Sequence, residues 1–200
     1  MPKLVTGYER QQTKNLIIEH TSHLIYIKKG IQGFTVEDIT RAARIGKRKF
    51  YTCFPSKEAC LFEVVEYSYQ AQLQAFKKIM EEKGSLKSKM TRFLKEVYLS
   101  EKSINNYFSP EDFHAILQKL PPTYTEREER MTSEVLETAM TYIDLTRAQW
   151  EALVMLLDCL TYTATRSYVE NAKKAKEAKE ATLDILINSI ADYVEKQTQC

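Results

Sequence analysis

The sequence predicts an all-α protein with about nine helices, in which a small N-terminal helix-turn-helix domain precedes a C-terminal helical bundle. Only 5 Gly and 5 Pro occur in 200 residues, a composition that favours long helices over turn-rich folds. Residues 1–57 contain 11 of the 29 Lys and Arg residues but 4 of the 27 Asp and Glu residues, and the remainder is net negative. An ordinary solvated surface does not readily give this segregation. We therefore expect only the N-terminal part to meet a polyanion.

The first helix is expected over residues 9–29, after a loose arm at residues 1–8. Its core-facing positions by helical spacing are Ile18, Ser22, Ile25 and Tyr26. Gly30 is predicted to end this helix in a left-handed conformation.

Two short helices joined by a tight turn are predicted within residues 35–54. Thr35 suits an N-cap whose hydroxyl accepts a hydrogen bond from the N–H of Asp38, and an acidic residue there suits the positive helix end. A second short helix begins near Lys47 and places two aromatic residues, Phe50 and Phe54, on its buried side. A short basic helix docked on an apolar one is the arrangement that presents side chains to a major groove.

The side chains around this second helix are candidates for DNA contact: Thr35, Arg44, Lys47, Arg48, Lys49, Tyr51, Thr52 and Lys57. Three of them are candidates for base edges, and Arg48 can pair with guanine through two hydrogen bonds: Lys47, Arg48 and Thr52. Three others are expected to contact the phosphate backbone: Thr35, Tyr51 and Lys57. Lys49 suits either role. A cation at the start of a helix opposes the helix dipole, which for Lys57 suggests a bound phosphate.

Ser56 is expected to cap a long fourth helix, which runs to about Lys83 and is stopped by Gly84. Later helices are indicated over residues 85–100 and from Ser109-Pro110 to Pro121. Capping boxes at Thr125-x-x-Glu128 and Thr146-x-x-Gln149 predict the next two starts, and the last helix is expected over residues 172–196.

The pattern between Gly30 and Leu61 resembles the DNA-binding domain of the tetracycline-repressor (TetR) family of bacterial transcriptional regulators. The most specific part is Tyr51 followed three residues later by Phe54-Pro55-Ser56-Lys57. Three positions depart from the family pattern and affect the turn and the base preference. Arg44 replaces the usual glycine, Gly46 the usual serine or threonine cap, and Arg48-Lys49 the usual small pair.

The resemblance implies a DNA-binding domain at residues 1–55 and a ligand-binding and dimerisation domain at residues 56–200, with the fourth helix as connector. It also implies a small-molecule effector, and a homodimer formed by the last two helices. Two reading helices placed about 34–36 Å apart can enter successive major grooves, which gives the dimer a physical motive. The interface candidates are Leu157, Leu160, Leu183, Leu186, Ile187, Ile190 and Val194. These apolar faces can instead be satisfied within one subunit.

The effector pocket has aromatic candidates and one acid: Tyr98, Phe108, Phe113, Tyr142, Trp150, Asp158, Tyr162 and Tyr168. Aromatic residues at helical spacing are more often core. Asp158 within an apolar run suggests a polar pocket edge, but a salt bridge or an exposed bundle edge is the favoured alternative.

We find no nucleophile–base pair, phosphate-binding glycine loop or metal-ligand spacing, so neither an enzyme nor a cofactor is expected. The four cysteines, at 53, 60, 159 and 200, are scattered, as are His20, His23 and His114. No signal peptide or membrane span is indicated, so a cytoplasmic protein with reduced thiols is expected. The rival functional hypothesis is a helical dimeric adaptor without specific DNA binding. The clustered cations beside Tyr51 argue against it.

Overall fold

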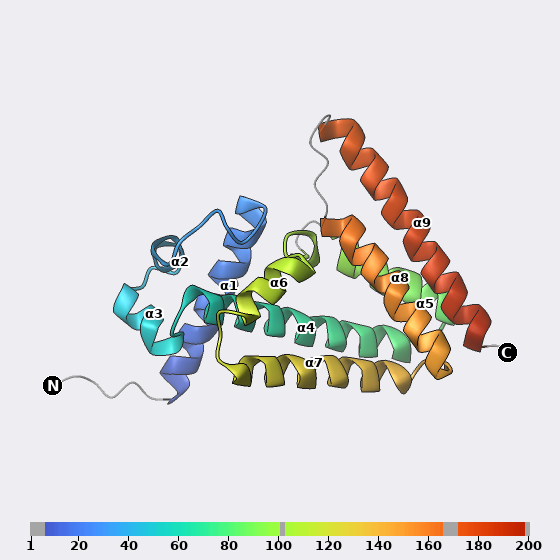
Figure 1. Ribbon diagram of the computed structural model, residues 1–200, viewed down its shortest axis with the longest axis horizontal. Coiled ribbons are helices and arrows are strands. Elements are labelled where there is room, and N and C mark those ends of the chain that lie inside the picture. The colour runs from blue at the N-terminus through green and yellow to red at the C-terminus, as the bar shows by residue number, and fades with distance from the viewer. Residues whose placement is uncertain (1–6, 101–102, 166–171, 199–200) are drawn as a thin grey trace. The chain divides into compact units, whose positions relative to one another are not determined.

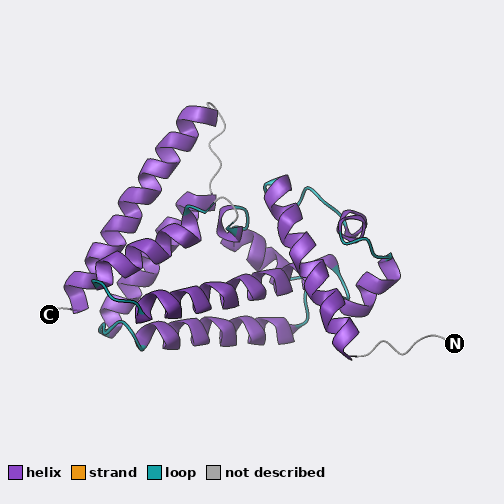
Figure 2. Cartoon of the chain, turned by 180° about the vertical axis from the view of Figure 1, so that it is seen from behind, coloured by secondary structure: helices purple, strands orange, loops and turns teal. Residues whose placement is uncertain are grey.

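The structure is a computed structural model that describes residues 7–100, 103–165 and 172–198. Within these ranges it contains only helices and connecting loops, which confirms the all-α prediction (Figures 1 and 2). The elements are α1 Gly7–Lys28, α2 Val36–Ala42, α3 Lys47–Cys53, α4 Lys57–Glu81, α5 Leu86–Tyr98, the 3-10 helix η1 Ile104–Asn106, α6 Pro110–Leu117, α7 Pro122–Met140, α8 Arg147–Thr165 and α9 Ala172–Thr198. Of the expected N-terminal arm, residues 7 and 8 already belong to α1, and residues 1–6 lie outside the described ranges.

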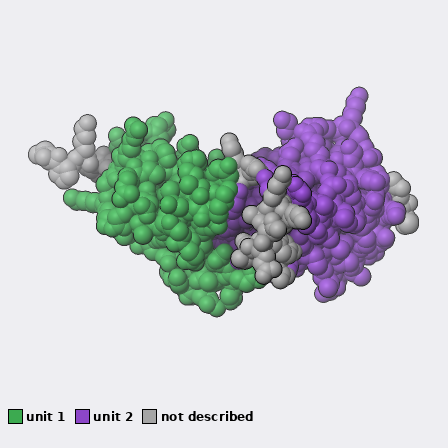
Figure 3. Space-filling model, turned by 90° about the horizontal axis from the view of Figure 1, so that it is seen from above, with its two compact units in different colours: residues 1–68, 110–128 green, residues 69–109, 129–200 purple. Residues whose placement is uncertain are grey.

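The chain divides into two compact units, which Figure 3 distinguishes by colour. Unit 1 comprises residues 1–68 and 110–128, and unit 2 comprises residues 69–109 and 129–200. Both α4 and α7 begin in unit 1 and end in unit 2. This grouping differs from the sequence-based boundary at residue 55, because unit 1 also takes in the start of α4, all of α6 and the first turns of α7.

Large apolar side chains form the core of unit 1. Phe50, Phe54 and Phe62 are at most 2% exposed, and Ile17 and Ile39 are fully buried. Burying a side chain of this size stabilises the fold by about 1.5–3 kcal/mol. The two phenylalanines predicted to anchor α3 do so.

The buried face of α1 includes two of the expected residues, Ile18 and Ile25, together with Ile17 and Thr21, which were not expected. Thr21 is fully buried, whereas Ser22 and Tyr26 are only half-buried. The Thr21 hydroxyl donates to the Ile17 carbonyl at 2.7 Å, so this polar group is satisfied inside the core. A threonine can therefore occupy a position where the sequence pattern favours an aliphatic residue.

The C-terminal end of α1 corrects the expectation for Gly30. Lys29 is the residue in the left-handed conformation, with φ of 55°, and Gly30 follows it with φ of 151°. The N–H of Gly30 donates to the Ile25 carbonyl at 3.1 Å, and that of Lys29 donates to the Tyr26 carbonyl at 3.4 Å. These two bonds form a Schellman motif, so the helix ends one residue earlier than predicted.

The start of α7 is also corrected. This helix begins at Pro122, so Thr125 lies inside it and does not cap it. Proline is favoured at the first helical position because its missing N–H would be unpaired there in any case. At α8 the capping box is confirmed: the Thr146 N–H donates to the Gln149 side chain at 2.7 Å, and the Gln149 N–H donates to the Thr146 hydroxyl at 3.4 Å.

In unit 2, α9 packs mainly against α5 and α8. Five of the residues expected to contact a partner subunit lie in this core, each at most 3% exposed: Leu160, Leu183, Ile187, Ile190 and Val194. The other two, Leu157 and Leu186, are half-buried and pack against it. Most of these side chains are thus covered within one subunit, as the alternative interpretation allowed, and a role in a subunit interface stays a prediction.

Candidate nucleic-acid interface

The start of α2 is fixed by a reciprocal capping box. The Asp38 N–H donates to the Thr35 hydroxyl at 3.3 Å, and the Thr35 N–H donates to the Asp38 carboxylate at 2.8 Å. The hydrogen bond from the Thr35 backbone, followed by that from its hydroxyl, lowers the pKa of Asp38. Thr35 is exposed, so this end of α2 is rigid and open to solvent.

The turn from α2 to α3 is a second Schellman motif. Arg44 takes the left-handed conformation with φ of 52°. The Arg44 N–H donates to the Arg41 carbonyl at 3.2 Å, and the Ile45 N–H donates to the Thr40 carbonyl at 2.9 Å. Gly46, in contrast, has an ordinary extended conformation and caps α3 without any side-chain hydrogen bond. The backbone conformation that favours glycine therefore occurs at Arg44, not at Gly46.

The third helix presents one apolar and one polar side. Phe50 is buried, and its ring contacts that of Phe54 with centroids 5.7 Å apart. All five helical residues expected to face DNA are exposed: Lys47, Arg48, Lys49, Tyr51 and Thr52. The Tyr51 ring packs edge-on against Phe50 at 5.3 Å while remaining 52% exposed. The structure thus brings the predicted side chains together on one short, anchored helix.

The exposed cations of α3 differ in what they already bind. Lys47 forms an ion pair with Glu37 of α2, and the hydrogen bond from Lys47 is the main cause of the lowered pKa of Glu37. Exposed pairs of this kind contribute little to stability, about 0–1 kcal/mol, and can be exchanged for a phosphate. Within the described ranges, Arg48 and Lys49 form no ion pair.

Lys57 has structural partners that its sequence position did not suggest. Its ammonium group donates to the carbonyls of Ile31 and Phe34, each at 2.7 Å, and lies 4.3 Å from the centre of the Phe34 ring. Burial lowers the pKa of Lys57. These carbonyls explain a cation at the start of α4 without a bound anion. Contact with a phosphate stays a prediction.

Within unit 2, the described candidate pocket residues do not share one environment. Tyr98, Tyr142 and Trp150 pack in or against the core of unit 2, where the Tyr98 and Thr161 hydroxyls lie 3.0 Å apart. Desolvation raises the pKa of Tyr98 to about 12. Phe108 is buried outside that cluster.

The remaining pocket candidates lie elsewhere. Asp158 and Tyr162 are exposed, so Asp158 is not the buried carboxylate of a pocket wall. Phe113 belongs to unit 1 and stacks on Phe62 at 5.9 Å. Tyr168 falls outside the described residues.

A shallow polar groove of about 580 Å³ lies between α5 and α9, and it contains none of the predicted pocket residues. Its cations already have acidic partners: Lys87 pairs with Asp192 and Lys95 with Asp184, both at 2.6 Å.

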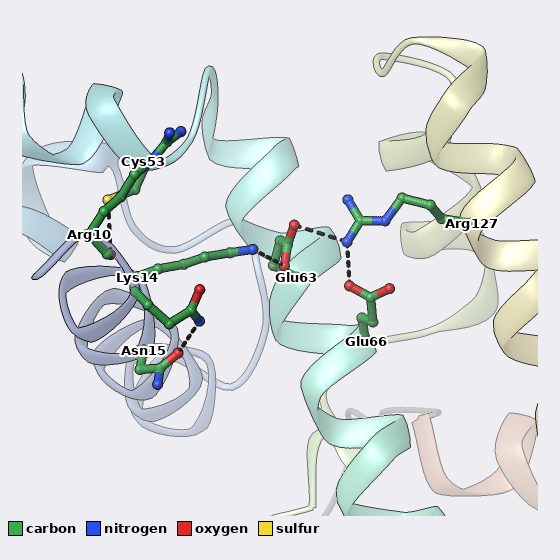
Figure 4. A network of polar contacts seen from close by, with 8 residues as sticks. Arg10, Lys14, Asn15, Cys53, Glu63, Glu66 and Arg127 are labelled. Carbon is green, nitrogen blue, oxygen red and sulfur yellow. Dashed lines mark hydrogen bonds and ion pairs between the residues drawn. The ribbon is translucent and has the colours of Figure 1, made fainter. Parts of the chain in front are cut away.

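One polar cluster was not anticipated from the sequence. Glu63 and Glu66 on α4 both accept from Arg127 of α7, and Glu63 also accepts from Lys14 of α1 (Figure 4). Two acids three apart on a helix face are the signal in the sequence, but their partners are far away along the chain. Considering only residues whose positions are described, no cluster of His, Cys, Asp or Glu is arranged to hold a metal ion. In the same ranges, no helix is long and apolar enough to cross a bilayer.

Comparison with known proteins agrees with this geometry. Residues 17–64 match the sequence profile of bacterial regulatory proteins of the tetR family. A relative from Bacillus subtilis (strain 168), the uncharacterized HTH-type transcriptional regulator YuxN, is 28% identical over 135 residues. The aligned region covers 66% of this chain and 43% of that protein, so the chain spans less than half of this relative's length.

Solved structures share the fold along nearly the whole chain. A TetR family transcription regulator from Marinobacter aquaeolei VT8 superposes with a TM-score of 0.56 at 14% identity, covering 94% of this chain and 98% of that one. RolR in complex with the ligand resorcinol gives a TM-score of 0.52 at 18% identity, covering 94% and 90%.

The matched family, the relative and the first solved structure are all described as regulatory proteins and not as enzymes. The profile match coincides with the part of unit 1 that carries the capped α2, the Schellman turn and the basic α3. Residues 17–64 therefore match the tetR family of bacterial regulatory proteins, and the chain shares its overall fold with solved regulators described as members of that family.

Proposed function

We propose that the protein is a homodimeric, sequence-specific DNA-binding transcriptional regulator of the cytoplasm. It acts as a repressor that leaves a palindromic operator when a small molecule binds. The observation that carries the DNA-binding part is α3: its aromatic anchors are buried, and all five of its candidate contact residues are exposed. Such a helix enters a major groove with its side chains already positioned.

Within this surface, Arg48 reads a guanine edge, because its guanidinium has no recorded competing ion pair in the described structure and can donate two parallel hydrogen bonds. Thr52 and Lys47 lie beside it as further base contacts. Tyr51 and the capped end of α2 at Thr35 hold the phosphate backbone, and Lys49 and Arg44 add positive charge.

Lys57 acts by shaping the loop before α2, with any phosphate contact made by its remaining N–H. Lys57→Ala should therefore weaken binding to all duplexes alike. Arg48→Ala should instead relax sequence preference at one base pair, with a discrimination loss of about 1–3 kcal/mol.

The subunits pair through faces of α8 and α9 that the core leaves open. Val154, Met155 and Tyr162 of α8 are 47–68% exposed, and Ile185 of α9 is 66% exposed. Large apolar side chains gathered on an open helix face are typical of an interaction site. A twofold dimer would present two copies of α3 to successive major grooves.

Repression would be relieved by a ligand that prefers the arrangement unable to bind DNA. Typical couplings of about 1–3 kcal/mol change affinity 5- to 150-fold. RolR, which shares the fold, is bound to the small aromatic molecule resorcinol. This likeness supports a small-molecule effector as a class but not its identity. A compound that raised the melting temperature yet left operator affinity unchanged would count against the coupling.

The decisive experiment is selection of bound sequences from a pool of random duplexes, followed by gel shifts over a salt series. We expect an inverted repeat with half-sites one helical turn apart, and an affinity that falls steeply with salt as phosphate contacts release counterions. Recovery of no common sequence, with equal binding of wild type and Arg48→Ala, would refute sequence-specific recognition. It would favour a helical adaptor instead.

A further inference from the structure

A cluster of four charged side chains joins three helices of unit 1 (Figure 4). Glu63 of α4 lies at the centre: one of its carboxylate oxygens is 2.7 Å from Lys14 of α1, and the other is 3.0 Å from Arg127 of α7. The same Arg127 nitrogen also binds Glu66, one turn further along α4. Two acids and two bases balance one another.

This cluster is better shielded from water than the other ion pairs of the described structure. The side chain of Glu63 is 14% exposed, and those of Arg127, Glu66 and Lys14 are 28–29% exposed. The Arg127 guanidinium lies 5.0 Å from the centre of the Phe62 ring and 5.4 Å from that of Tyr124. Because it is partly desolvated and one guanidinium nitrogen is shared by two carboxylates, this contact restricts the geometry more than an exposed ion pair does.

Arg127 lies one residue before the point where α7 passes from unit 1 into unit 2. The polypeptide passes between the units after residue 68, after residue 109 and after residue 128. Two of these passages lie inside helices, α4 and α7. Within unit 1 the start of α7 is fastened to α4 by Arg127. Without that contact, α4 alone would be the stiff connection between the DNA-reading helices and unit 2.

We propose that Arg127 is a positioning residue for DNA binding: it clamps α7 to α4 through Glu63 and Glu66, and Glu63 passes the restraint to α1 through Lys14. This inference rests on the proposed function, since it requires a dimer that grips two half-sites. The clamp keeps the two copies of α3 in the dimer at the spacing of the two half-sites of a palindrome. When the clamp is broken, each copy of α3 still recognises its own half-site. The second copy then binds at a lower effective concentration, because it is held less firmly at the required spacing.

The test compares two duplexes: the palindrome recovered by selection, and a duplex that contains one half-site. Arg127→Met keeps a long apolar side chain beside Phe62 and Tyr124 but removes the guanidinium. We expect this variant to bind the palindrome about tenfold more weakly, a typical size for coupling between sites. Affinity for the single half-site should change by less than about twofold. The matched control is Arg147→Met, because the Arg147 side chain is 94% exposed and pairs with Glu151 of its own helix.

Two further variants make the assignment specific. Glu63→Gln should weaken palindrome binding in the same direction. Arg127→Met combined with Glu63→Gln should lose less than the sum of the two single losses, because both changes break the link between Arg127 and Glu63. Additive losses would contradict a shared clamp.

Stability is measured in parallel, since a partly buried arginine also contributes to folding. Equal weakening on both duplexes, in step with a lower melting temperature, would overturn the proposal in favour of a purely structural role. Unchanged binding to both would overturn it directly. If wild type itself prefers no palindrome, the proposed function fails first, so the two failures are distinguishable.

Discussion

Arg44 occupies a backbone conformation that suits glycine, and its replacement gives a prediction with a defined sign. Its φ is 52°, and its side chain is exposed at the turn between α2 and α3. An L-residue in the left-handed region costs roughly 1–2 kcal/mol. Glycine would remove this strain but would make the unfolded chain more flexible, at a cost of about 0.4–1 kcal/mol. Arg44→Gly should therefore raise the free energy of unfolding by about 0.5–1 kcal/mol.

The assay is urea unfolding followed by two probes. Far-ultraviolet circular dichroism reports the helices of both units, and fluorescence of Trp150, the single tryptophan, reports unit 2. If the units unfold separately, only the dichroism transition of unit 1 should move to higher urea. If they unfold together, both probes should move equally.

Arg41→Gly is the matched control. Arg41 is an exposed residue of α2 with an ordinary helical conformation, and glycine there should destabilise by about 1 kcal/mol. Lys29→Gly tests the same principle at the end of α1. A smaller gain is expected there, because the Lys29 ammonium lies over the Tyr26 ring at 4.4 Å. A lower free energy of unfolding for Arg44→Gly, or the same sign for Arg44→Gly and Arg41→Gly, would refute the reasoning.

Three further outcomes follow from the structure. Thr35→Ala removes the N-cap of α2 and should lower the free energy of unfolding by about 1 kcal/mol in urea titrations. The pKa of Asp38 is lowered in the folded protein. Its stabilising contribution is therefore present above the pKa of the unfolded state and is lost as the pH falls through the pKa of the folded state. Asp38→Asn should reduce this loss of stability in acid unfolding curves. Burial raises the pKa of the Cys60 thiol to about 12, so Cys60 should resist a thiol reagent at pH 8 in the folded protein. Exposed Cys159 should react readily, and more slowly at protein concentrations that favour pairing through α8; a labelling rate independent of concentration would argue against that face as the interface.

Local signals in the sequence predicted helix starts well where a side chain supplies the cap. Thr35 and Thr146 both make the hydrogen bonds expected of them. The same reasoning failed at Thr125, because Pro122 starts α7 one turn earlier. It also failed at Gly30, because Lys29 accepts the left-handed conformation in its place. Several residues near a helix end can satisfy the same backbone groups, and the sequence does not rank them.

Long-range packing explains the larger differences. The sequence left open whether a partner subunit or the same chain covers the apolar stripe of α9, and α5 and α8 of the same chain bury most of it. Periodicity shows that a stripe must be covered but not which surface covers it. Asp158 shows the same limit: the sequence allowed a pocket edge but favoured a salt bridge or an exposed bundle edge, and the structure places Asp158 exposed on α8.

The sequence by itself determined the all-helical class, the capped helix pair and a basic third helix anchored by Phe50 and Phe54. These features depend on hydrogen bonds and spacings within a few residues, which the order of amino acids specifies directly. Only the tertiary structure decided which apolar faces stay exposed, and that Arg127 reaches Glu63 across 64 positions of the chain. Contacts between distant segments depend on how whole helices pack, and no local pattern encodes that choice.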